Sequence, residues 1–152
     1  MSELSYLMDW FEVYLRHKDV FLKKIQGVEK KDNIMNVAFK DAPKSYFFYL
    51  NLKDVQMDKV KAAQNPSIVF LNNPENLKEV LRIWPKMIEI RMLSIYSVNP
   101  FSEIDNKWIL FPYTHHQVSD PESLELGLKA MAEMVQAISA EDFARKAKQQ
   151  KE

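Results

Sequence analysis

The sequence predicts an α+β fold, in which an antiparallel or mixed β-sheet of about five strands is packed by N-terminal and C-terminal helices. Apolar residues recur at helical spacing in residues 2–17. Three short β-rich segments follow between residues 20 and 52, and a capped amphipathic pattern returns near residue 119. Because runs of strands between helices are typical of α+β proteins, we expect the two terminal helices to cover one face of the sheet.

The composition indicates one globular domain. The 152 residues are 47% hydrophobic and 28% charged, which is the ordinary range for such domains. We expect a single α+β domain over residues 1–140 and a charged C-terminal helical extension or frayed tail over 141–152.

Residue counts exclude several classes of function. Lysine plus arginine and aspartate plus glutamate both total 21, so the positive field that attracts nucleic acid is absent. The chain has no cysteine, which removes disulfides, thiolate nucleophiles and cysteine-bound zinc. Two glycines are too few for dinucleotide-binding, P-loop or nucleophile-elbow motifs. We expect no metal and no cofactor.

The chain shows no targeting signal. Its first ten residues, MSELSYLMDW, resemble neither a signal peptide nor a transit peptide. No apolar run reaches the roughly 18 residues that a membrane span requires. We therefore expect a cytoplasmic protein that does not enter a membrane.

The first helix, over residues 2–17, has two apolar lines. The main line comprises Leu4, Leu7, Met8, Phe11, Tyr14 and Leu15. A second line, Tyr6, Trp10 and Val13, runs beside it. Either the helix is buried on two sides, or the second line contacts a partner protein or a second subunit.

Residues 20–52 predict an antiparallel meander. The strands are VFLKKIQGV, NIMNVAFKD and SYFFYLNL, and the turns between them are EKKD and APK.

The middle of the chain predicts two helices and two strands. A short helix over 54–64, capped by Asp54, ends at Asn65-Pro66, and residues 67–71 form a buried strand. Asn73-Pro74 opens a helix that Pro85 closes. Residues 87–98 alternate apolar and polar side chains, which favours a strand that is half exposed.

The last part predicts a strand at 108–111 and two helices. Ser119 and Glu122 have the spacing of a capping box, and one apolar face follows over 124–138. A second cap, Ser139 with Asp142, begins a shorter charged helix. Gly127 interrupts the longer helix, and a close approach of that helix to the sheet would explain it.

The stretch KWILFPYTHHQVSDPES, residues 107–123, contains the candidate ligand-binding residues Trp108, Tyr113, His115, His116 and Asp120. The aromatic residues offer stacking area and the histidines titrate near neutrality, as at a pocket rim. Alternatively, the histidines cap or hydrogen-bond a structured loop. Neighbouring residues on a strand point to opposite faces, which disfavours a metal site. No spacing rule selects catalytic residues.

Two features of the sequence, one passage and the order of the expected elements, resemble known families. The passage YFFYLNLKDVQMDKVKAAQNPSIVFL is similar to one in the flavin-binding split barrels related to pyridoxamine phosphate oxidase, through Lys59, Val60, Asn65, Pro66, Ile68 and Val69. That resemblance implies a flavin phosphate near Lys59, although Met57 replaces the family's hydroxyl and Asp58 adds negative charge. The order of elements resembles the dimeric chaperones of type III secretion, which bind partner chains.

These observations favour a non-enzymatic protein-interaction, adaptor or chaperone-like module. We expect a homodimer or another homo-oligomer that binds a protein or peptide partner, with Tyr6, Trp10 and Val13 at the interface. The alternative is a small-ligand-binding protein or enzyme, flavin-type or histidine-assisted, that uses the Trp108–Asp120 segment.

Overall fold

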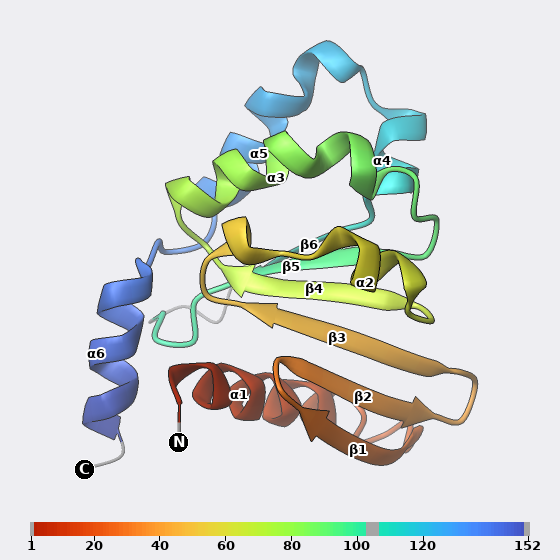
Figure 1. Cartoon of the computed structure of the whole chain (residues 1–152), viewed down its shortest axis with the longest axis vertical. Coiled ribbons are helices and arrows are strands. Elements are labelled where there is room, and N and C mark those ends of the chain that lie inside the picture. The colour runs from red at the N-terminus through yellow and green to blue at the C-terminus, as the bar shows by residue number, and fades with distance from the viewer. Residues whose placement is uncertain (1, 103–106, 151–152) are drawn as a thin grey trace.

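The computed structural model of the chain describes residues 2–102 and 107–150. They form an α+β domain around one mixed sheet of six strands, in the order β1-β2-β3-β4-β5-β6 (Figure 1). The strands are β1 (Ile25–Lys31), β2 (Ile34–Phe39), β3 (Pro43–Tyr49), β4 (Pro66–Leu71), β5 (Ser94–Val98) and β6 (Trp108–Leu110). The predicted fold class is confirmed, with six strands in place of about five.

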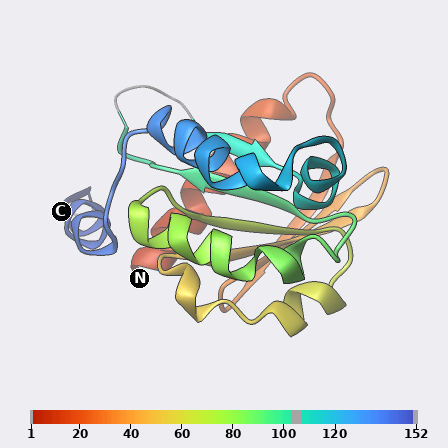
Figure 2. The same ribbon diagram turned by 90° about the horizontal axis from the view of Figure 1, so that it is seen from above.

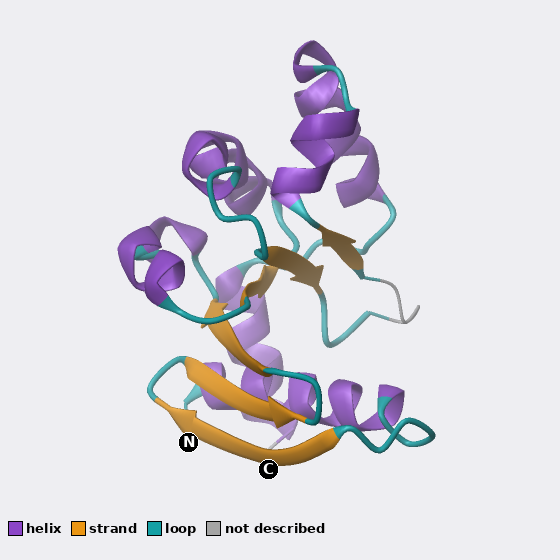
Figure 3. Cartoon of the chain, turned by 90° about the vertical axis from the view of Figure 1, so that its right-hand side faces the viewer, coloured by secondary structure: helices purple, strands orange, loops and turns teal. Residues whose placement is uncertain are grey.

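Strand direction changes across the sheet. Strands β1 to β3 are antiparallel, β3 to β5 are parallel, and β6 is again antiparallel. The parallel pairs require crossover connections, which contain helices α2 (Met57–Ala62) and α3 (Pro74–Met87). Figure 3 shows that the sheet twists between its β1–β2 end and its β5–β6 end.

Helices cover both faces of the sheet. The terminal helices α1 and α6 share one face, as expected, whereas α5, which belongs to the long C-terminal helix that the sequence predicts, lies on the other face. One buried cluster contains apolar residues of α1 and α6, and a second contains residues of α2, α3 and α5. Figure 2 shows α3 and α5 next to each other above the sheet. The remaining helical elements are α1 (Glu3–Lys18), η1 (Leu52–Asp54), α4 (Pro112–Val118), η2 (Pro121–Ser123), α5 (Leu124–Glu133) and α6 (Ala140–Gln150). Within the described residues, none of the helices is both long and apolar enough to cross a bilayer.

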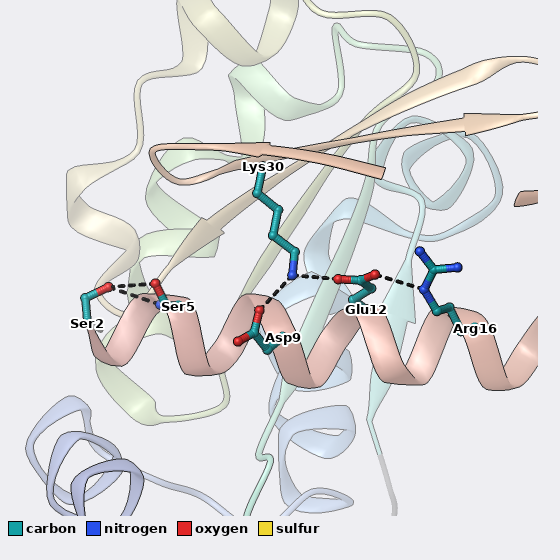
Figure 4. Close-up of polar contacts among 6 residues, drawn as sticks. All are labelled: Ser2, Ser5, Asp9, Glu12, Arg16 and Lys30. Atoms are coloured by element: carbon teal, nitrogen blue, oxygen red, sulfur yellow. Dashed lines mark hydrogen bonds and ion pairs between the residues drawn. The ribbon is translucent and has the colours of Figure 1, made fainter. Parts of the chain in front are cut away.

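Helix α1 packs on the sheet through the predicted main line. Phe11 is fully buried and contacts the rings of Tyr46 and Tyr96 at centroid distances of 5.2 and 5.1 Å. The solvent side of the helix is attached to β1 by Lys30, whose Nζ lies 2.7 Å from Asp9 Oδ1 and also pairs with Glu12 (Figure 4). Figure 4 also shows the Ser2 cap at the start of α1.

The segment after residue 140 is attached to α1. In α6, Phe143 and Ala147 are buried in the same cluster as Leu7 of α1. The Ser139 cap is confirmed, because its Oγ accepts the Asp142 backbone N–H at 3.1 Å. The division into residues 1–140 and 141–152 stays a prediction, and residues 151–152 lie outside the described part.

A buried asparagine joins the C-terminal ends of the central strands to the last third of the chain. Asn72 Nδ2 donates to the carbonyls of Ala132 and Val135 at 3.0 and 2.9 Å. Its Oδ1 accepts from Ser97 Oγ at 2.8 Å and from Trp108 Nε1 at 3.2 Å. All hydrogen-bonding positions of this side chain are therefore used within the protein.

The neighbouring asparagines extend this network. Asn73 caps α3 by accepting the Asn76 backbone N–H at 2.8 Å, as the sequence predicts, and donates to the Ile138 carbonyl. Asn76 accepts the Leu52 N–H and donates to the Leu71 carbonyl. The segment NNPEN thus fixes the starts and ends of several elements at once.

The meander and the two middle helices differ locally from prediction. Glu29 to Lys31 belong to β1, and the turn is at Asp32 and Asn33, where Asp32 has a φ of 55° that aspartate tolerates. The expected cap Asp54 lies in η1, and α2 begins after Gln56 without a side-chain cap. Helix α3 continues through Pro85 to Met87, so Pro85 does not close it as the sequence predicts.

The strand expected over 87–98 is limited to β5. Residues 88–93 form a helix end and a turn, although Ile88, Ile90 and Met92 alternate with polar residues. All five residues of β5 are buried, because helices cover both sides of this central strand. The alternation of apolar and polar residues therefore did not predict the structure of residues 88–93.

The long helix predicted from Ser119 is divided. Ser119 ends α4, and Asp120 rather than Ser119 accepts the Glu122 N–H, at 3.0 Å. Helix α5 ends at Glu133, and Val135 and Ile138 are buried beyond it. The amides of Asn72 and Asn73 bond the carbonyls released by this break.

Gly127 does not serve a close approach, so that expectation is also wrong. It is exposed in α5, and a Cβ at this position would meet no atom within 4 Å. Its backbone has no positive φ that would favour glycine. The glycine therefore weakens the helix without a packing reason.

We predict that Gly127→Ala stabilises the protein by about 1 kcal/mol, because alanine has the higher helix propensity and reduces the entropy of the unfolded chain. Urea-induced unfolding followed by circular dichroism measures this change. A loss of stability would contradict the open environment of this position.

We predict that Asn72→Ala lowers the free energy of unfolding by about 3 kcal/mol, because it leaves several buried donors and acceptors unsatisfied. The matched control is Asn36→Ala, at an exposed position of β2 with one side-chain bond from Ser45. The control should lose less than about 1 kcal/mol. Equal losses in the two variants would show that the network is not the main contribution.

Candidate binding groove at the end of helix α1

The hollow whose lining best combines apolar and charged side chains is an open groove of about 460 Å³ at the C-terminal end of α1, here called the α1 groove. It lies between that helix end, the β2–β3 connection and the sheet. This volume is in the range of small-molecule and peptide pockets.

Apolar side chains form most of the α1 groove. They include Leu15, Leu22, Phe39, Met92 and Phe111. Met92 is 63% exposed and Phe111 is 52% exposed. Phe21, next to Leu22 in the loop after α1, is 94% exposed. Exposed apolar residues concentrated in this way are typical of an interaction surface.

Two lysines, Lys18 of α1 and Lys44 of β3, also line the α1 groove. Neither forms an ion pair with a carboxylate within the described residues. Their ammonium groups instead lie over aromatic rings, Lys18 at 5.5 Å from the centroid of Tyr14 and Lys44 at 5.8 Å from that of Tyr46. The groove therefore holds positive charge that a ligand could pair with.

The acidic residues of the α1 groove already have partners. Asp41 pairs with Lys24 at 3.0 Å. Asp19 accepts the backbone N–H groups of Ile25 and Lys24, and the bond from Ile25 contributes most to holding the pKa of Asp19 below its usual value. These carboxylates are thus used to hold the loop after α1.

Burial changes the acid–base properties of three groups in the groove. Burial, and then the nearby charge of Lys18, lower the pKa of Lys44 below its ordinary value. Burial raises the pKa of Tyr46, and it raises the pKa of Tyr96 to about 12. Both phenols are therefore protonated at neutral pH and can donate hydrogen bonds.

The structure separates the candidate residues of the 107–123 stretch. Trp108 is 5% exposed and packs edge-on against Phe70, so its ring faces the core. Tyr113 is half-buried on α4 with Arg91 over its ring at 5.1 Å. Neither residue lines the small hollow that holds the histidines and Asp120.

His115, His116 and Asp120 do lie around one hollow, of about 70 Å³. The histidines are on helix α4 rather than in a loop or strand, which corrects that expectation. His115 packs edge-on against Trp84 at a centroid distance of 5.7 Å. The hollow is several times smaller than ordinary ligand pockets. No group of three metal-ligating side chains occurs in residues 2–102 and 107–150.

The candidate interface residues of α1 are differently placed. Tyr6 stacks on Phe101 at 5.2 Å and contacts Phe143, and Trp10 stacks on Tyr14 at 6.4 Å. Val13 is 61% exposed. Aromatic contacts within the chain therefore half-bury two of the three residues.

Lys59, the residue that carries the flavin resemblance, lies on the other side of the molecule. It lines a hollow of about 330 Å³ with Asp32 and Asp54. Two carboxylates oppose a phosphate group at this position. The surrounding sheet is open, with parallel β3 and β4.

Comparisons with family models, curated proteins and solved structures found no match to this chain. The functional argument therefore depends on the geometry of the chain. Sequence reasoning missed Lys18, Lys44, Tyr46 and Tyr96, because they come from three separate elements. Alternation in SYFFYLNL placed Tyr46 on one face of its strand, but no local pattern showed which lysines approach it.

We predict that Lys44→Met stabilises the folded protein at neutral pH, because it removes a buried charge next to Lys18. The unfolded chain binds more protons than the folded chain between the lowered pKa of Lys44 and the ordinary value of 10.5, so wild-type stability rises with pH in this window. The advantage of the variant should therefore shrink from about pH 7 to pH 10. Urea titrations of both proteins measure it.

Lys30→Met is the matched control, and we expect it to change the stability at neutral pH in the opposite direction. Burial acts to lower the pKa of Lys30, but its bonds to Asp9 and Glu12 outweigh burial and raise the pKa. The stability that Lys30 contributes is present below pH 10.5 and is lost as the pH rises through the folded pKa. A Lys44→Met variant that loses stability at neutral pH, as Lys30→Met should, would contradict the unpaired state of Lys44.

Proposed function

We propose that this domain is a non-enzymatic protein-interaction module that binds a partner through the α1 groove. The occupant is a segment that carries aromatic or aliphatic side chains next to aspartate or glutamate. One observation carries this proposal: among the residues that the structure describes, Lys18 and Lys44 of this apolar groove form no ion pair with a carboxylate. A carboxylate that reached Lys18 or Lys44 would supply the missing charge, while apolar side chains would cover the groove wall.

Apolar surface beyond the groove supports a protein rather than a small molecule as the occupant. Val20 and Phe21 lie outside the groove lining and are 55% and 94% exposed. A small ligand inside the groove would leave these side chains in water, whereas a peptide segment could cover them. The same proposal includes the cytoplasmic location and the homodimer expected from the sequence.

A second candidate function is the binding of a small amphipathic acid in the same groove. The groove volume of about 460 Å³ favours it, since many small ligands occupy such a space. Native mass spectrometry of the purified protein tests this candidate and also reports the number of subunits. A bound acid would appear as extra mass on the intact protein.

The sharpest test of the peptide proposal is selection from a random dodecapeptide library displayed on phage. We expect the protein to enrich sequences in which acidic residues adjoin aromatic or aliphatic ones. A synthetic peptide of the enriched sequence should then bind with a dissociation constant that is about tenfold weaker for Lys44→Glu, because the substitution reverses a charge facing the ligand. Fluorescence anisotropy at two salt concentrations measures this change.

Lys53→Glu provides the matched control, because it makes the same charge change at an exposed position in η1, outside the groove. Its affinity for the peptide should remain close to that of the wild type. The proposal fails if no acidic and apolar sequence is enriched, or if Lys44→Glu and Lys53→Glu bind the peptide equally well.

A further inference from the structure

We propose that Lys44 is a reactive amine that forms a reversible imine with an aldehyde bearing an aliphatic or aromatic body. This inference goes beyond peptide binding and does not depend on it. It rests on the placement of one half-buried lysine in an apolar groove, beside a second lysine and two protonated phenols.

The position of Lys44 determines which compounds can reach its amine. Its side chain is half-buried, lies on the same face of β3 as Tyr46 and lines the α1 groove. Leu15 and Phe39 line the same space. An aldehyde with an apolar chain can place that chain against these residues and its carbonyl carbon near the amine.

The surroundings favour the neutral amine, which is the nucleophilic form. Burial removes water that would solvate the ammonium, and the charge of Lys18 opposes a second positive charge nearby. No carboxylate of the described residues pairs with Lys44 to restore the ammonium. Lys30 on β1 has the opposite setting, since Asp9 and Glu12 stabilise its protonated form.

The reaction is balanced without an oxidant or reductant. The lone pair of the neutral Lys44 Nζ attacks the carbonyl carbon, and the electron pair of the C=O bond moves to oxygen. The nitrogen loses a proton, the oxygen gains one, and the resulting carbinolamine loses water as the C=N bond forms. Tyr46 and Tyr96 line the same groove as phenols and can donate hydrogen bonds to the carbinolamine oxygen. Hydrolysis of the imine reverses every step.

The test uses hexanal as the probe and sodium cyanoborohydride to trap imines as stable secondary amines. Peptide mapping by mass spectrometry then gives the modification rate of every lysine between about pH 6 and pH 9. At neutral pH we expect Lys44 to react several-fold faster than the exposed Lys53 and on the order of tenfold faster than Lys30. Accessibility alone would favour Lys53, so a faster Lys44 requires activation by its surroundings.

Two variants show whether the surroundings of Lys44 activate its amine or whether its rate reflects accessibility alone. Lys18→Met should slow Lys44 at neutral pH, because removal of the like charge favours the ammonium, while leaving the rate of Lys53 unchanged. Lys44→Arg should remove the fast site altogether. Thermal melting followed by circular dichroism confirms that both variants are folded.

The proposal is overturned if Lys44 reacts no faster than Lys53 in the wild type, or if Lys18→Met leaves its rate unchanged. Either result is separate from the peptide experiment, which uses ligands without an aldehyde. Fast modification of Lys44 without peptide enrichment would support the amine and contradict the interaction module. Peptide enrichment without fast modification of Lys44 would support the interaction module and contradict the reactive amine.

Discussion

The fold depends on the saturated hydrogen bonding of Asn72, at the end of the central strand β4. Its side chain contacts β5 through Ser97, β6 through Trp108 and the end of α5 through two carbonyls. Its backbone adds bonds to Val98 and Ile138. In a buried site each of these groups would be costly to leave unpaired, so β4, β5, β6 and the end of α5 have one mutually consistent arrangement here.

This constraint also explains where a binding site can form. The central strands carry helices on both faces and the Asn72 network at one end, where the polar side chains already bond within the protein. The α1 groove lies at the C-terminal end of α1, where the helix stops and the loop 19–24 leads to β1. Apolar side chains that are not covered by helix remain exposed in that region.

Two lysines, Lys30 on β1 and Lys44 on β3, show how the candidate site differs from a surface that only stabilises the fold. Lys30 has two carboxylate partners on α1 and holds β1 against the helix. Lys44 has no carboxylate partner in the described part of the chain, and burial and the charge of Lys18 favour its neutral form. Natural proteins commonly accept such local loss of stability at functional positions, which is the physical ground for assigning a function to Lys44.

The sequence by itself determined the elements whose signals are local. The apolar line of α1, the buried strand β4, the Asn73-Pro74 start of α3 and the Ser139 cap are set by residues within one or two turns of each other. The excluded classes of function also came from the sequence, since they depend only on the absence of cysteine, the scarcity of glycine and the balance of charge.

Only the tertiary structure decided the strand order, the parallel pairing of β3 to β5 and the distribution of helices on both faces. Long-range pairing has no signal in local periodicity, which is why Ile88, Ile90 and Met92 suggested a strand that the chain does not form. The same holds for the site. Which lysine lacks a carboxylate partner depends on elements far apart in the chain, because ion pairs and burial are properties of the packed molecule and not of any one segment.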